Sequence, residues 1–191
     1  MKYSKIEIKH LFISWLAISL AFAIARGDFG NFDKFVVAII FSAITVGLGF
    51  IAHELSHKYL AQKYGAFAEF RANFPMLGFA VLLSITGIVF AAPGAVIILG
   101  RISKDNYGKV SAAGPISNFI LAILFGILAL TTAGTLKEIS SYGFLINSWL
   151  GAFNLLPFGM FDGQKILNWN KTIYGILVAV GFILIGISGY V

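Results

Sequence analysis

The sequence has no cysteine, few charged residues and no long polar stretch. The absence of cysteine excludes a disulfide framework, a thiolate nucleophile and thiolate ligands, so any metal must be bound by histidine, aspartate or glutamate. Charged residues make up only 12% of the 191 residues and hydrophobic residues make up 59%. This balance is far from that of a soluble globular domain, and it predicts an integral membrane protein.

The net charge of +6 comes from basic residues in short flanks between apolar runs. Such flanks are typical of membrane topology, and their distribution argues against nucleic-acid binding. The N-terminal apolar run is not followed by a small-residue cleavage site, so we expect a retained span instead of a removed signal peptide. We expect residues 1–191 to form a single transmembrane core domain without a PDZ or CBS domain.

The segment 74–99 differs from the other apolar runs, because glycine and proline interrupt its β-branched and aromatic residues. A single helix has the right length, but short strands or a re-entrant hairpin suit these residues better. The predicted fold is therefore an all-α polytopic membrane protein with about five or six transmembrane helices and a small membrane-embedded β-hairpin or re-entrant segment. The predicted helices comprise residues 11–25, 35–60, 111–132, 142–158 and 172–191.

Basic residues also predict which side of the membrane each flank faces. With a cytoplasmic N-terminus and a segment 74–99 that returns to its starting face, eleven basic residues are cytoplasmic and three, Arg26, Lys34 and Lys137, lie opposite, which accounts for all 14. This bias predicts a multi-pass protein, expected in the cell membrane, that is in contact with the lipid bilayer.

Two of the three histidines, His53 and His57, are four positions apart, and Glu54 directly follows the first. On a helix the two imidazoles face one side and can share a metal, while the adjacent carboxylate can transfer protons. Ionisable groups inside an apolar run are costly and usually functional. The pattern predicts a zinc hydrolase site; the alternative is a structural His/Glu cluster. His10 is expected to be an interfacial imidazole without a metal.

A catalytic zinc site typically has three protein ligands and one open position. Asp162 is the best third candidate, because other carboxylates lie in flanks or loops; Pro157 should end the preceding helix and leave Asp162 on unwound backbone. The alternative is a turn-capping aspartate. Zinc would acidify a water, and Glu54 would take its proton. Asn154 could donate to the oxyanion or simply link helices.

Another polar residue in an apolar run is Asn118, which closes the sequence Gly114-Pro115-Ile-Ser-Asn118. The small residues permit close helix approach, and Pro115 is tolerated in a first helical turn. We expect Asn118 to form hydrogen bonds across helices, with catalysis as the alternative.

Together, three motifs resemble the site-2 protease family of intramembrane zinc metalloproteases. They are His53-Glu54-Leu-Ser-His57 in one span, Gly114-Pro115-Ile-Ser-Asn118 opening a later span, and Asn154-Leu-Leu-Pro157 followed by Asp162-Gly163. Where the family often has Asp-Gly-Gly-Arg, this chain has Asp162-Gly163-Gln164-Lys165.

The resemblance implies one zinc ion bound by His53, His57 and Asp162, with Glu54 as the general base and Asn154 assisting at the catalytic site. It also implies a membrane-spanning or membrane-associated polypeptide substrate, as in regulated intramembrane proteolysis. A strand-like membrane element, as the family has, could hold an unwound substrate by adding a strand.

Two other functional classes stay open at this point. One is a proteolytically inactive scaffold of the same fold that binds membrane proteins, although a binder has no use for the carboxylate of Glu54. The other is a divalent-metal transporter, which should offer ligands along a path through the membrane, whereas this sequence offers one cluster near one face.

Overall fold

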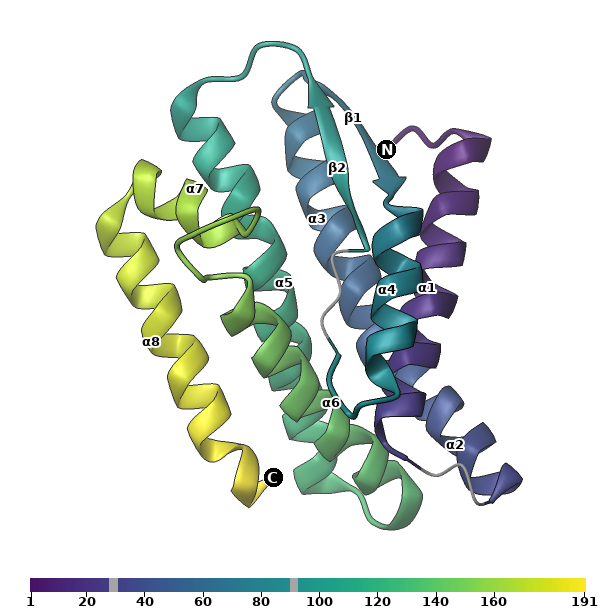
Figure 1. Ribbon diagram of the computed structural model, residues 1–191. Helices are drawn as coiled ribbons and strands as arrows, with labels where there is room; N and C mark the ends of the chain where they lie inside the picture. The colour runs from purple at the N-terminus through teal and green to yellow at the C-terminus, as the bar shows by residue number, and fades with distance from the viewer. Residues whose placement is uncertain (28–30, 90–92) are drawn as a thin grey trace.

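The computed structural model describes residues 1–27, 31–89 and 93–191. This part of the chain is a bundle of helices with one two-stranded antiparallel sheet (Figure 1). The elements are α1 (Lys5–Ala25), α2 (Phe32–Ser42), a π-helical turn (Ala43–Gly47), α3 (Leu48–Lys63), β1 (Phe67–Ala72), α4 (Phe74–Ser84), β2 (Gly94–Leu99), α5 (Lys104–Thr131), α6 (Gly134–Phe153), α7 (Asp162–Trp169), α8 (Lys171–Ile187) and a 3₁₀ turn (Ser188–Tyr190).

Polar side chains define where several helices begin. Ser4, Asn31, Asn73, Ser103 and Asn170 each accept a hydrogen bond from a backbone N–H in the first turn of α1, α2, α4, α5 and α8, respectively. These N-terminal N–H groups have no partner within their own helix, so a side-chain oxygen stabilises the helix start.

The start of α5 differs from the sequence prediction. Ser103 caps the helix, and its first turn is polar, so α5 begins at Lys104 and not at residue 111. Hydrophobicity alone misses such a turn. As a result Pro115 lies in the helix interior and not in the first turn. Because proline has no N–H, it cannot donate a hydrogen bond to the Ser111 carbonyl.

Four helical segments of the described residues are long and apolar enough to cross a membrane: Lys5–Ala25, Phe32–Lys63, Lys104–Thr131 and Lys171–Tyr190. The second combines α2, the π-helical turn and α3. The 20-residue helix α6 is not among them; it carries Lys137 and Glu138 near its start and further polar residues inside. The chain is thus a mostly helical membrane protein, but the predicted count of five or six spans is not confirmed.

The prediction of strands for segment 74–99 is only partly correct. Residues Phe74–Ser84 form helix α4, because Asn73 caps its start and Pro75 is compatible with its first turn. Gly94–Leu99 is a strand, but its partner Phe67–Ala72 precedes the predicted segment. Residues 90–92 of the segment lie outside the described residues.

The sheet nevertheless returns the chain to the end of the bundle from which it left. The antiparallel register pairs Leu99 with Phe67 and Gly94 with Ala72 (Figure 1). Between these strands, α4 packs against α1. This path has the character of the predicted re-entrant segment, built from a helix and a strand in place of two adjacent strands.

Side chains of α1 close the outer edge of β1. The Phe70 N–H donates to Glu7 Oε1 at 3.0 Å, and the Ala72 N–H donates to His10 Nδ1 at 3.1 Å. The other carboxylate oxygen of Glu7 forms an ion pair with Lys58 of α3, and both side chains are fully buried. Glu7 therefore joins α1, α3 and the sheet at one point.

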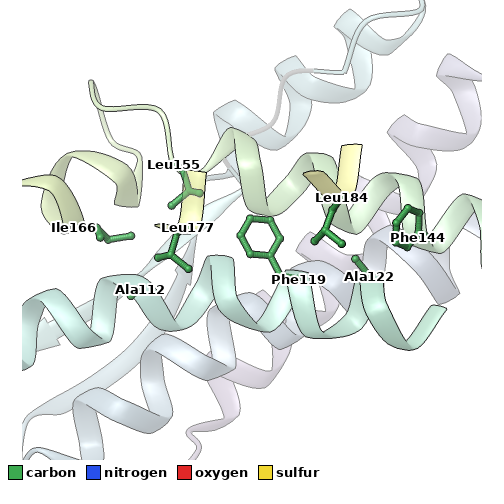
Figure 2. Close-up of a cluster of buried hydrophobic side chains, with 8 residues drawn as sticks. All are labelled: Ala112, Phe119, Ala122, Phe144, Leu155, Ile166, Leu177 and Leu184. Atoms are coloured by element: carbon green, nitrogen blue, oxygen red, sulfur yellow. The ribbon is translucent and has the colours of Figure 1, made fainter. Parts of the chain in front are cut away.

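A buried apolar cluster joins α5 and α6 to α7 and α8 (Figure 2). In this cluster Phe119 of α5 lies between Leu177 and Leu184 of α8. Ile166 of α7 is also completely buried in it. Because α7 is short, this contact fixes its position on the bundle, and with it the position of Asp162 at its first residue. The cluster comprises Ala112, Phe119, Ala122, Phe144, Leu155, Ile166, Leu177 and Leu184.

Candidate metal centre

Three side chains from α3 and α7 converge at one buried point. His53 and His57 lie one turn apart on α3, and Asp162 is the first residue of α7. The Oδ2 atom of Asp162 lies 3.3 Å from Nε2 of His53 and 3.0 Å from Nε2 of His57. One ligand atom from each residue lies within 4.8 Å of the others. This arrangement fits the donor set of a zinc site.

The other ring nitrogen of each histidine, Nδ1, forms a hydrogen bond with an oxygen atom of α5. His53 Nδ1 lies 2.7 Å from Asn118 Oδ1, and His57 Nδ1 lies 2.7 Å from the Val110 carbonyl oxygen. A carbonyl oxygen only accepts, so Nδ1 of His57 carries the hydrogen and its Nε2 has a free lone pair. Such outer partners orient histidine ligands and raise their basicity.

Gly114 of α5 provides the space in which the two Nε2 atoms sit. A Cβ atom at this position would collide with Nε2 of both His53 and His57. The glycine of the Gly-Pro motif therefore allows α5 to approach the ligands closely. A backbone cradle with no side chain, facing the Nε2 atoms of both histidines, is a further observation that fits a bound ion.

The prediction that Asp162 lies on unwound backbone is wrong, because Asp162 is the first residue of helix α7. The chain leaves α6 at Asn154 and turns at Gly159, which has φ +66°, before α7 begins. An acidic side chain in a first turn is favoured by the helix dipole. The Gly163 N–H donates to the Asn154 carbonyl at 2.8 Å and ties the new helix to the old one.

Lys165, three residues along α7, was missed by the sequence analysis. Its Nζ lies 3.0 Å from Oδ1 of Asp162, which is the carboxylate oxygen that does not face the imidazoles. The Lys165 ammonium group, at this distance, favours the ionised form of the Asp162 carboxylate, which is the form that binds a metal. The spacing of three residues in a helix could have indicated this pair.

Glu54 lies in the same cavity, on the next position of α3. The cavity of about 130 Å³ is lined by the three candidate ligands, by Glu54 and Asn154, and by residues of β2 and α5. Glu54 is 8% exposed, and its carboxylate faces the backbone N–H of Val96 in β2. A carboxylate is thus available beside the ligands without occupying a ligand position.

Asn154 reaches the cavity wall, but its amide is partly engaged. Its Nδ2 donates to the Leu150 carbonyl at 2.9 Å, within its own helix. An amide nitrogen carries two hydrogens, so one donor is left for another acceptor.

By contrast, the prediction for Asn118 is confirmed: it forms hydrogen bonds across helices, to α3 and to α6. The role of the Val110 carbonyl was not predicted, and no sequence signal could have revealed it, because every residue has a carbonyl.

Fold and site together define a membrane-embedded metalloprotein with the donor set of a zinc hydrolase. The chain is 43% identical over 194 residues to "Putative zinc metalloprotease MJ0611" of Methanocaldococcus jannaschii. The alignment covers 99% of this chain and 96% of the relative. It belongs to the site-2 protease family of zinc metalloproteases.

Two more distant relatives are longer. "Zinc metalloprotease MJ0392" of the same organism is 27% identical over 85% of this chain, and "Putative zinc metalloprotease Rip3" of Mycobacterium tuberculosis is 27% identical over 83%. The chain spans 41% and 38% of their respective lengths. No family model and no solved structure matches the chain.

Proposed function

We propose that this protein is an intramembrane zinc metalloprotease that cleaves membrane-spanning or membrane-associated polypeptides. The observation that carries the proposal is the convergence of His53, His57 and Asp162 beside Glu54, in a cavity lined by β2, a strand that pairs only with β1 among the described residues. Within the described part of the chain, these three residues are the only group of three or more histidine, aspartate or glutamate side chains that could hold a metal ion. A metal transporter would need further sites along a path through the membrane.

One zinc ion per chain would be held by His53 Nε2, His57 Nε2 and the Asp162 carboxylate. When bound, zinc polarises a carbonyl group and lowers the pKa of a bound water to about 7. Glu54 accepts the proton of the attacking water and delivers it to the amine nitrogen as the peptide C–N bond breaks. The second amide hydrogen of Asn154 is available to the carbonyl oxygen on which negative charge develops.

The edge of β2 that points away from β1 is the proposed binding site for the substrate backbone. Phe70 pairs with Val96 in the register, and the Phe70 N–H points away from β2, towards Glu7. In an antiparallel pair the opposite residue has the same orientation, so the N–H and carbonyl of Val96 point away from β1. The Val96 N–H faces Glu54, whereas Ile98, two residues further along β2 and with the same orientation, also lines the cavity. A substrate strand that pairs with Ile98 would thus lie next to the ligands.

This edge supplies the test of the proposed function. In proteoliposomes with a membrane-spanning substrate, the wild type is expected to cleave the substrate, and a zinc chelator should stop cleavage. Ile98→Pro removes an outward N–H that does not face Glu54, from an edge position that tolerates proline, so cleavage should fall at least about tenfold while zinc content is unchanged. Cleavage products would be measured by mass spectrometry.

The matched control is Ile98→Ala, which also removes the isoleucine side chain but keeps the N–H. Its cleavage rate should stay near that of the wild type. Equal rates for Ile98→Pro and the wild type would contradict strand addition at β2, and the absence of any chelator-sensitive cleavage would contradict the protease itself.

We propose that the chain crosses the membrane several times, with the metal centre nearer the cytoplasmic face. The support is the distribution of basic residues: eleven lie in the flanks expected on the cytoplasmic face and three lie in those expected on the opposite face. The chain has no cysteine, so single substitutions can report the side. A thiol reagent that does not cross membranes should label Lys137→Cys, but not Lys63→Cys, in intact cells; the opposite pattern would reverse the topology.

A further inference from the structure

Two fully buried asparagines, Asn118 of α5 and Asn147 of α6, connect the metal centre to the π-helical turn before α3. Asn118 Nδ2 lies 3.1 Å from the Gly49 carbonyl and 3.2 Å from Asn147 Oδ1, and Asn118 Oδ1 lies 2.7 Å from His53 Nδ1. Both side chains are completely buried. Only one of these contacts reaches a candidate ligand, so the function of the second asparagine requires an explanation.

The orientation of each amide follows from main-chain carbonyls, which only accept hydrogen bonds. Asn147 Nδ2 lies 2.9 Å from the Gly143 carbonyl and 3.4 Å from the Thr45 carbonyl, so this end of the amide must be the NH₂ group. Its oxygen therefore faces Asn118. In the same way, the Gly49 carbonyl requires the NH₂ group of Asn118 on its side. The amide oxygen of Asn118 must then face His53.

This chain of contacts determines which nitrogen of His53 is free. Since Asn118 presents an oxygen, Nδ1 of His53 must carry the hydrogen, and Nε2 has a lone pair directed at Asp162. If the Asn118 amide were reversed, its NH₂ would face Nδ1 and favour the other tautomer, in which Nε2 is protonated and cannot bind a metal. His57 needs no such device, because the Val110 carbonyl can only accept.

The surroundings leave little room for other arrangements. A Cβ atom at position 49 would collide with Asn147 Oδ1, so Gly49 allows α6 to approach α3 here. Thr45, whose carbonyl receives Asn147, lies in the π-helical turn Ala43–Gly47. Turns of this kind are rare and frequently occur at functional sites.

We propose that Asn147 is a positioning residue, which holds the Asn118 amide in the orientation that keeps Nε2 of His53 free to bind zinc. The inference rests on the proposed zinc site. It assigns to α6 a part in ligand geometry although this helix supplies none of the three candidate ligands. It also distinguishes the two histidines, because only His53 depends on side-chain amides for its tautomer.

The test measures the zinc dissociation constant of detergent-purified full-length protein by competition with a chelator, together with the visible spectrum of the cobalt(II) form. Asn147→Leu should weaken zinc binding by roughly tenfold and alter the cobalt spectrum, as expected for loss of an outer partner. Ser148→Ala is the matched control, because Ser148 is equally buried and, among the described residues, donates only to the Phe144 carbonyl of its own helix. It should bind zinc as the wild type does.

A second pair of variants separates orientation from packing. In Asn118→Asp the side chain presents an oxygen to His53 in either orientation, although it no longer donates to the Gly49 carbonyl. In that background Asn147→Leu should leave zinc affinity unchanged, although it should still lower the unfolding temperature. These variants also give a result if Asn147→Leu alone folds poorly.

Two outcomes would overturn the inference. An unchanged zinc affinity and cobalt spectrum in folded Asn147→Leu would do so, and so would an equal loss of affinity from Asn147→Leu in both backgrounds. If the wild type itself binds no zinc, the proposed function fails together with the inference; if only the Asn147 effects are missing, the zinc site stands.

Discussion

Replacement of Glu54 by glutamine is expected to lower the rate of peptide hydrolysis by about 10²- to 10⁴-fold, the contribution typical of a general acid–base group. The amide is close in shape to the carboxylate but cannot accept the proton of the attacking water. Because the three candidate ligand atoms belong to other residues, zinc content should stay near that of the wild type. The measurement is initial cleavage of a membrane-spanning substrate in proteoliposomes, with zinc determined on the same samples.

The matched control is Glu138→Gln, which makes the same chemical change at an exposed position near the start of α6. It should cleave at the wild-type rate. Wild-type cleavage by Glu54→Gln would exclude Glu54 as the base and would favour a different proton acceptor. Conversely, if cellular phenotypes did not change in Glu54→Gln although cleavage was lost, the physiological role would be that of a binding scaffold.

The second large effect concerns the metal. Purified wild type should contain about one zinc per chain, and His57→Ala or Asp162→Ala should contain almost none, since each removes one of three protein ligands. Gly114→Ala should have a similar effect without removing a ligand, because the added methyl group would occupy the space of both Nε2 atoms. Zinc would be measured by elemental analysis of protein that elutes as a folded species.

Asp33→Ala is the control for loss of a carboxylate, because Asp33 is exposed in the first turn of α2. Full zinc content in folded Asp162→Ala would show that the third ligand lies elsewhere in the chain. A wild type without metal, even after zinc is supplied, would contradict the zinc protease and move the interpretation to a metal-free scaffold.

The local part of the site could be predicted from the sequence, because the spacing of His53 and His57 determines their relative position once a helix forms. Asp162 lies more than a hundred residues further on. It was found by elimination, because the other carboxylates lie in flanks or loops, although its place at the start of α7 was not foreseen. That helix depends on packing of Ile166 against α5 and α8, which no local pattern reveals.

The sheet shows a different limit. Gly94–Leu99 has the residues of a strand, whereas β1 contains Glu69 and Arg71 and lies outside the apolar run, so its pairing with β2 could not be seen in the sequence. The partners of the histidines were equally hidden. A main-chain carbonyl such as that of Val110 leaves no signature, and Asn147 reads as one of several polar residues in α6.

The buried ion pair between Glu7 and Lys58 has a consequence for stability in the bilayer. Each charge would be costly to leave in a membrane without the other, and Lys58 directly follows His57. The helix that carries both histidines is therefore stable in this position only while Glu7 of α1 lies against Lys58. The first span thus supports the metal centre without contributing a ligand to it.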